Sequence, residues 1–295
     1  SYARPRVLTV SLGLLAALGF GAADFAGGLA AKRLHTLAVT GAVALVGLIV
    51  LGTTSLLLRD QWSVEGAFWG AMSGVTGVAA IGLLYACLAR GPMSILSPTT
   101  AVLSALVPMT YGFIRGEALS PWVYPALGLA LVAVVLVGFV PDERAIRPTP
   151  TALMMAIGSG VLIGLFYIFI DLAPDSSGIT PLVANRMLQF MLVGLILLVV
   201  VLARGRSFLI KPVANPWPWS RVVWVLVAGG ILDALSNIAV LTGFRVGEVT
   251  IVAVLTALYP AGTILLASVV LHERIQRVQW VGLGLALVAS MLLAT

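Results

Sequence analysis

Ten apolar runs, each about 20 residues long, follow one another along the sequence and are bounded by charged or turn residues. A helix of that length crosses the hydrocarbon core of a bilayer. Backbone groups in hydrocarbon must be paired within the segment, and the alternation typical of barrel strands is absent, so the runs are predicted to be helices. They cover 7–31, 36–58, 66–89, 92–114, 121–140, 152–172, 179–203, 221–244, 248–271 and 277–295.

Composition excludes a soluble fold for these runs. Hydrophobic residues make up 60% of the chain and charged residues 9%, whereas soluble domains carry about 25% charged residues. A soluble fold of this length could not bury so much apolar surface, so an all-α integral membrane protein is predicted. The first run follows Arg4 and Arg6 in the manner of a signal peptide, but it is too long for an ordinary signal sequence and is expected to be a retained helix.

The net charge of +6 does not indicate a nucleic-acid partner, because the bases are spread over short loops. Membrane lipid headgroups are their expected partners. The single cysteine, Cys87, lies inside an apolar run and provides neither a disulfide framework nor a thiolate site. His35 and His272 lie at the ends of runs. No metal and no cofactor are therefore expected.

One heptapeptide, LGLALVA, occurs twice, at 127–133 and at 283–289, which is an offset of 156 residues. Other residues align at the same offset, each in a comparable place near the start of a run or in a polar turn: Gly91 with Gly247, Ser94 with Thr250, and Glu117 with Glu273. These shared features indicate a duplicated unit rather than a chance repeat.

Five runs fit within one period, and a chain that crosses a membrane five times ends on the side opposite its start. The second copy is therefore predicted to have inverted topology. Inverted repeats are typical of secondary transporters, in which the substrate binds between the halves near the membrane midplane. The sequence predicts ten transmembrane helices as two inverted five-helix repeats, residues 1–147 and 148–295, around a central cavity.

A polar turn follows the fourth run of each half, Gly116–Glu117 in the first and His272–Glu273 in the second. This arrangement resembles the drug/metabolite transporter superfamily, and within it the ten-helix EamA-type exporters. The resemblance implies a cavity lined by helices 1, 3, 4, 6, 8 and 9, with helices 5 and 10 at the periphery, and substrates such as amino acids, metabolites and drugs. Within this group, the resemblance extends to an exporter of aromatic amino acids. The chain departs from the pattern at His272, where glycine is usual, and at Pro108, which lies later in its run than Pro260.

Ionisable side chains at membrane depth are candidate functional residues, because burying them is costly. Asp24 lies well inside the first run, and it is interpreted either as a cation or proton site or as a helix-end residue that reaches headgroup water. Asp233 lies in the middle of the eighth run, with Asn237 one turn later on the same face. This polar face is predicted to look into the cavity.

The fourth run carries a polar stripe at steps of three or four residues: Ser97, Thr100, Ser104, Pro108 and Tyr111. Thr256, Tyr259 and Pro260 form a weaker echo in the ninth run. Cavity lining and helix packing are both consistent with such hydroxyls. Pro108 and Pro260 are predicted hinges, because proline removes a helical hydrogen bond and permits a bend.

The seventh run carries Asn185, a candidate for substrate binding, and Arg186. Arg186 is interpreted either as a side chain that reaches back to the interface or as a clamp for a substrate carboxylate. Tyr85 and Tyr167, with Phe166 and Phe244, are candidates for an aromatic cavity wall, although packing would explain them as well.

These features predict a secondary transporter, a monomer, that exports small amphipathic metabolites by alternating access, most plainly amino acids (aromatic or other neutral). A multidrug or quaternary-cation exporter of the same superfamily is the alternative. In other classes, an enzyme is disfavoured because no catalytic or nucleotide-binding motif is found, whereas a channel or scramblase is left open. An inner-membrane location is expected. The distribution of bases favours external termini, with five bases on their side and eleven opposite, whereas the resemblance favours cytoplasmic termini, which we adopt.

Overall fold

The structure is a computed structural model that describes residues 3–90, 93–139, 148–212 and 217–295. Regular structure in these residues is helical apart from one isolated bridge, Leu34 to Ile210. The helices are α1 (Ala3–Ala30), α2 (Thr36–Leu58), α3 (Val64–Leu88), α4 (Met93–Ile114), α5 (Val123–Gly138), α6 (Pro150–Asp171), α7 (Thr180–Arg204), α8 (Trp219–Val246), α9 (Val249–Thr256), α10 (Tyr259–Val270) and α11 (Arg277–Leu293), with short 3-10 turns η1 (Asp175–Ser177) and η2 (Arg206–Leu209).

Seven helical segments within the described residues are long and apolar enough to cross a membrane. Two further apolar helices, α5 and α11, are shorter, with 16 and 17 residues. The prediction of a multi-pass, all-helical membrane protein is supported, while ten crossings and inverted halves stay predictions. The seven segments are Arg6–Ala30, Thr36–Leu58, Val64–Cys87, Pro150–Asp171, Thr180–Arg204, Trp219–Val246 and Val249–Val270.

The run predicted over 248–271 is divided into α9 and α10, which are separated by Ala257 and Leu258. Pro260 lies in the first turn of α10. Because proline has no N–H, it cannot donate to the carbonyl four residues earlier, and it is best accommodated at a helix start. Pro108, in contrast, lies inside α4, which is continuous through it.

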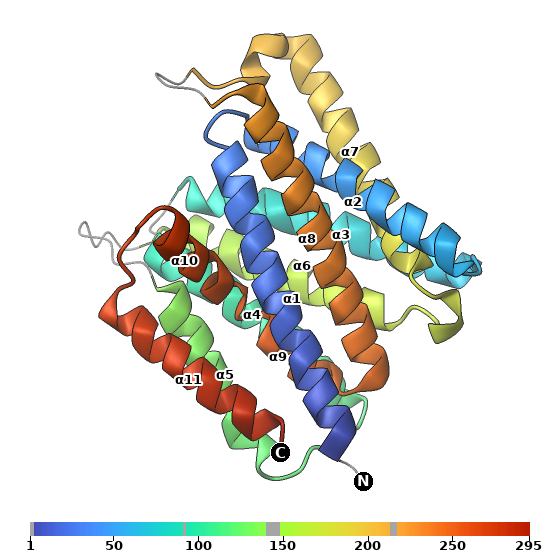
Figure 1. The fold of residues 1–295 in the computed structure, drawn as a ribbon, viewed down its shortest axis with the longest axis vertical. Helices are drawn as coiled ribbons and strands as arrows, with labels where there is room; N and C mark the ends of the chain where they lie inside the picture. Colours follow the sequence, from blue (N-terminus) through green and yellow to red (C-terminus); the bar gives the residue numbers. More distant parts are fainter. Residues whose placement is uncertain (1–2, 91–92, 140–147, 213–216) are drawn as a thin grey trace.

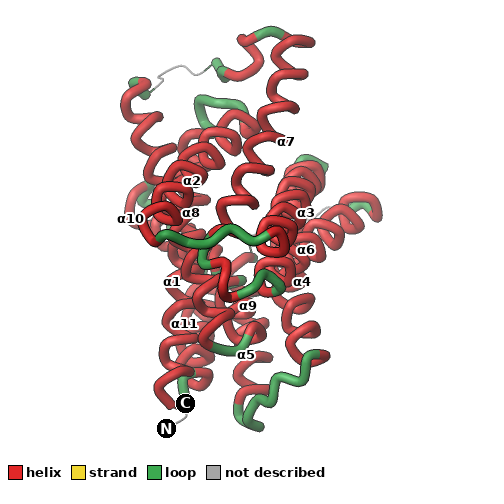
Figure 2. Tube along the Cα trace, turned by 90° about the vertical axis from the view of Figure 1, so that its right-hand side faces the viewer, coloured by secondary structure: helices red, strands yellow, loops and turns green. Residues whose placement is uncertain are grey.

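Helices from the two ends of the sequence interleave (Figures 1 and 2). The most extensively packed pairs join one helix of residues 1–147 to one of residues 148–295: α1 with α8, α9 and α10, α2 with α7 and α8, α3 with α6 and α7, α4 with α6 and α9, and α5 with α11. Neighbours within one half, such as α4 and α5, pack together less extensively. In Figure 1, α1 and α8 run side by side through the centre, and α5 and α11 form one edge. Both termini lie at the same end of the molecule.

Small residues allow two of these pairs to approach closely. A Cβ atom at Gly21 in α1 would lie 2.4 Å from the carbonyl oxygen of Tyr259, where α10 begins. A Cβ atom at Gly70 in α3 would lie 2.2 Å from the carbonyl oxygen of Pro181 in α7. Backbone approach of this kind is typical of packed membrane helices, because lipid gives little hydrophobic drive for their association.

Candidate functional site

A buried ion pair lies between α7 and α8. The guanidinium of Arg186 pairs with the carboxylate of Asp233, and the exposed fractions of the two side chains are 8% and 18%. Arg186 Nη1 also donates to Gln189 Oε1 at 2.7 Å. Asn237 Nδ2 donates to the backbone oxygen of Asp233 at 2.8 Å and approaches its Oδ2 at 3.4 Å. Arg186 therefore turns inward to a countercharge rather than outward to the membrane interface.

Two glycines on neighbouring helices leave room for this network. A Cβ atom at Gly47 in α2 would lie 3.4 Å from Cδ and Nε of Arg186. A Cβ atom at Gly77 in α3 would lie 2.8 Å from Nε2 of Gln189. The polar side chains of α7 are thus accommodated against helices of the first half of the sequence.

A cavity of about 140 Å³ lies beside the ion pair and is lined by α1, α3, α6, α7 and α8. It combines four polar side chains with an aromatic and aliphatic wall: Arg186, Gln189, Asp233 and Asn237, then Phe20, Phe166, Tyr167, Gly77, Ala80, Ile81 and Ile163. Its volume is below the roughly 300–1,000 Å³ of drug-sized pockets. The cavity is therefore suited to a small amphipathic molecule.

Asp24 lies among polar groups of four other helices. Its side chain is exposed, yet it interacts electrostatically with Asp233 on α8 and with tyrosines on α3, α6 and α10, namely Tyr85, Tyr167 and Tyr259. Phe20, one turn earlier on α1, lines the cavity beside the ion pair. The structure brings these five predicted residues together from helices of both halves of the sequence.

Several other predicted residues are used in helix packing. Thr100 Oγ1 donates to the carbonyl oxygens of Leu96 and Ala156 at 3.1 Å each, which joins α4 to α6. Ser104 donates to the carbonyl of Ala101 at 2.7 Å. Neither hydroxyl lines the cavity beside the ion pair. Thr100 joins two helices, whereas the hydrogen bond of Ser104 lies within α4.

The remaining candidates lie at different depths. Asn185 is buried, and its Nδ2 donates to Ser73 Oγ at 2.6 Å between α7 and α3. Ser97 is half-buried on α4. Thr256 is fully buried at the end of α9, and its Oγ1 has no hydrogen-bond partner among the described residues. Thr256 and Tyr259 therefore flank the break between α9 and α10.

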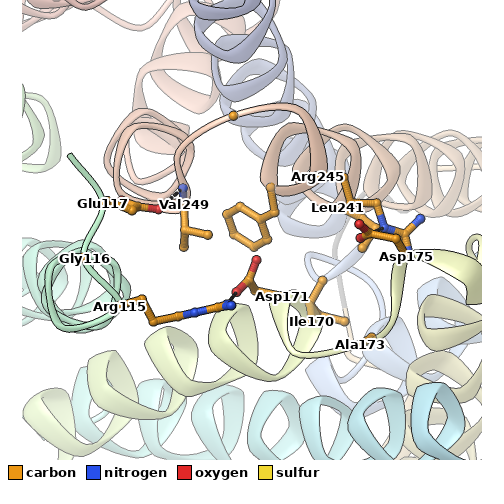
Figure 3. A pocket seen from close by; sticks show the side chains of 12 residues that line it. Arg115, Gly116, Glu117, Ile170, Asp171, Ala173, Asp175, Leu241, Arg245 and Val249 are labelled. Carbon is orange, nitrogen blue, oxygen red and sulfur yellow. Dashed lines mark hydrogen bonds and ion pairs between the residues drawn. The ribbon is translucent and has the colours of Figure 1, made fainter. Parts of the chain in front are cut away.

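A second cavity, of about 440 Å³, lies between the loop after α4, the end of α6 and the junction of α8 with α9 (Figure 3). Tyr111, which was predicted to line the substrate site, lies next to it. Tyr111 donates its hydroxyl to Asp171 Oδ2 at 3.2 Å, and Arg115 Nη1 contacts the same carboxylate at 2.9 Å. The hydrogen bond with Tyr111 and the charge of Asp171 raise the pKa of Arg115 above its ordinary value. We call this cavity the charged vestibule; its charged side chains are Arg115, Glu117, Asp171, Asp175 and Arg245.

The Gly116–Glu117 turn has a structural role that the sequence did not predict. Gly116 has a φ of +82°, a conformation that glycine adopts without strain. Glu117 then points at the start of α9, where its Oε1 accepts from the N–H of Val249 at 2.7 Å and its Oε2 from that of Thr250 at 3.3 Å (Figure 3). A carboxylate in this position satisfies free N–H groups and complements the helix dipole.

Comparisons with known proteins agree with a transporter fold. A solved structure described as "Crystal structure of protein" superposes with a TM-score of 0.69 at 18% identity, covering 96% of this chain and 95% of that one. At this identity the likeness concerns the fold alone. No curated protein sequence matches the chain. The model of the EamA-like transporter family matches residues 150–295, and this match supports a membrane transporter of the drug/metabolite transporter superfamily.

Proposed function

We propose that the chain is a secondary transporter that exports small amphipathic metabolites, foremost neutral or aromatic amino acids, across the inner membrane by alternating access. The observation that carries this proposal is the buried Arg186–Asp233 pair beside a small cavity. Charged groups are rare and costly at membrane depth and are kept there mainly for substrates, ions or protons. A cavity lined by helices from both halves is the expected place for a substrate in a two-repeat transporter.

The packing pattern supports ten helices in two inverted halves. If α1 to α5 correspond to α6, α7, α8, the α9–α10 pair and α11, then the α1–α8 contact maps onto the α3–α6 contact, and both occur. The α4–α6 contact likewise maps onto the contacts of α1 with α9 and α10. The pairs α2–α7, α4–α9 and α5–α11 map onto themselves. A two-fold relation between the halves accounts for all of these pairs.

Amino acids fit the electrostatics better than drug-sized cargo. The site carries both signs of charge, and so does the charged vestibule, where Arg115 and Arg245 face Glu117, Asp171 and Asp175. The cavity of about 140 Å³ also favours a metabolite over a drug-sized molecule. The second candidate, export of organic cations, is favoured by Asp24 and its surrounding tyrosines, since carboxylates and aromatic faces attract ammonium groups.

Counterflow in proteoliposomes tests the function directly. Purified protein would be loaded with one unlabelled neutral or aromatic amino acid and given trace labelled amino acid outside, with and without a pH gradient. We expect saturable accumulation above protein-free liposomes, and a dependence on the gradient would identify proton coupling. Exchange of a quaternary ammonium such as tetraethylammonium, without exchange of any amino acid, would contradict the proposal and favour the cation exporter.

The orientation follows from the resemblance. We place both termini, and with them the charged vestibule, in the cytoplasm, although the bases are fewer on that side. The inverted halves weaken the positive-inside argument, because the same loop bias is carried to opposite sides by the two copies. The protein would act as a monomer in contact with membrane lipid.

The break between α9 and α10 is the best candidate hinge. We expect Pro260→Ala to favour a continuous helix and to lower the turnover rate several-fold, with substrate affinity changing less, because the residue at 260 regains an N–H donor. Pro108→Ala should have the smaller effect, since α4 is already continuous at that position. Counterflow measures the turnover rate and the half-saturation concentration separately for each variant. Unchanged kinetics in both variants would contradict the hinge hypothesis.

A further inference from the structure

Two carboxyl groups from different halves of the sequence lie near one cavity, which Asp233 and Phe20, one turn before Asp24 on α1, both line. Asp24 lies on α1 and Asp233 on α8, and the two interact electrostatically. Arg186 pairs with Asp233, whereas Asp24 has no ion pair or hydrogen bond within the described part of the chain. The group therefore offers two carboxyl groups and one guanidinium, which suits a ligand that has an ammonium end and a carboxylate end.

We propose that the cargo binds as a zwitterion, with its ammonium group between Asp24 and Asp233 and its carboxylate on Arg186. This inference rests on the proposed function and deepens it, because it assigns the two charged ends of an α-amino acid to named side chains. It distinguishes this cargo from amines and from carboxylic acids of the same size.

Arg186 is placed to receive a carboxylate. It lines the cavity, and its Nη1 is bound to Gln189, which is a neutral acceptor at 2.7 Å. A carboxylate that replaces this amide oxygen exchanges a bond from the guanidinium to a neutral acceptor for one between opposite charges, which can also be bidentate. The planar guanidinium has five donors, so Arg186 serves the cargo while Nη2 stays with Asp233.

The ammonium end meets carboxylates and aromatic rings. Tyr167 lines the cavity beside Asp233, and its ring is held edge-on by Phe166 and Phe244 at centroid distances of 5.3 and 6.1 Å. Tyr85 and Tyr259 lie within electrostatic range of Asp24. An ammonium group in this space is paired by carboxylates and contacts the faces or hydroxyls of tyrosines.

The arrangement couples binding to the relative position of the halves. Without cargo, the negative charge of Asp233 opposes a second negative charge on Asp24 in the other half. An ammonium group between them replaces repulsion with two attractions, so it binds more strongly to the state in which α1 and α8 bring the carboxylates close. A ligand shifts a conformational equilibrium by such a difference in affinity.

The test uses three probes that share a side chain: L-valine, isobutylamine, which lacks the carboxylate, and isovalerate, which lacks the ammonium. Competition by each against labelled L-valine is measured with purified full-length protein in proteoliposomes, and the series is repeated with L-phenylalanine, phenethylamine and 3-phenylpropionate. We expect the wild type to bind the amino acid at least tenfold more tightly than either analogue.

The variants should give a crossed pattern. Asp24→Asn is expected to weaken binding of the amino acid and of the amine at least tenfold, while binding of the acid is unchanged. Arg186→Gln should weaken binding of the amino acid and of the acid, but not binding of the amine. Glu65→Gln, an exposed carboxylate at the start of α3, is the matched control and should behave as the wild type. Size-exclusion chromatography checks folding, and because Asp24 has no ion pair among the described residues, Asp24→Asn alone decides the matter if Arg186→Gln misfolds.

The outcomes separate this inference from the proposed function. Amino acids could be transported although Asp24→Asn weakens binding of all three probes equally, or although the wild type binds the three probes equally well. In either case the assignment of the zwitterion site is wrong and the proposed function stands. If no amino acid is bound or exchanged while the amines are, both are wrong. The crossed pattern supports both.

Discussion

We expect Asp233→Ala to abolish transport and to lower the stability of the protein by about 3–5 kcal/mol, which is the cost of breaking a buried ion pair from one side. The reason is that Arg186 would be left as an uncompensated cation with only 8% of its side chain exposed. Gln189 would remain as a neutral acceptor, and this does not replace a carboxylate. Counterflow and thermal unfolding of the detergent-purified protein measure the two effects.

Two variants separate the roles of charge and binding. The double variant Arg186→Gln/Asp233→Asn removes both charges at once, so it should recover most of the lost stability and none of the transport. Asn237→Ala removes the neighbouring amide without leaving an unpaired charge, and it should lower transport far more than expression. A melting temperature for Asp233→Ala equal to that of the wild type would show that the pair does not stabilise the fold.

A second large effect is expected at Gly21. In Gly21→Ala, the added Cβ would lie 2.4 Å from the carbonyl oxygen of Tyr259 and 2.7 Å from the backbone nitrogen of Thr263. Backbone atoms cannot rotate away as a side chain does, so α1 and α10 must separate. Overpacking typically costs about 1–3 kcal/mol, and we expect the upper part of that range or more, with a corresponding fall in melting temperature.

Gly28 provides the matched control on the same helix. A Cβ atom there would meet no heavy atom within 4 Å. Gly28→Ala should therefore be neutral or should stabilise α1 slightly, by up to about 1 kcal/mol from helix propensity. Equal melting temperatures for the two alanine variants would contradict the close packing of α1 against α10.

Hydropathy predicted the helices well, because the length of an apolar run is a local property of the sequence. The predicted run 36–58 coincides with α2 (Thr36–Leu58). The ninth run was predicted as one helix with a bend at Pro260, and the break before this proline follows from its missing N–H. The local sequence was therefore sufficient to predict these helices and the position of the break before Pro260.

Contacts between helices were not predictable in the same way. The partner of Arg186 is 47 residues away on another helix. The position of Arg186 in the sequence favoured a side chain that reaches the membrane surface. The stripe of Thr100 and Ser104 was ambiguous, since a face that lines a cavity and a face that packs on another helix have the same period. The clustering of Asp24 with Asp233 depends on the packing of α1 on α8, which no single run contains.

The contact of Glu117 with α9 has a consequence for how the molecule moves. Every residue of α9 is buried, α9 packs on α4, and its first turn is fastened to the loop that follows α4. Although α9 belongs to the second half of the sequence, it is expected to travel with the first half as one rigid body. The seam between the moving parts would then pass between α9 and α10, at Ala257 and Leu258, so that the boundary of the proposed duplication and the mechanical boundary of the protein would lie in different places.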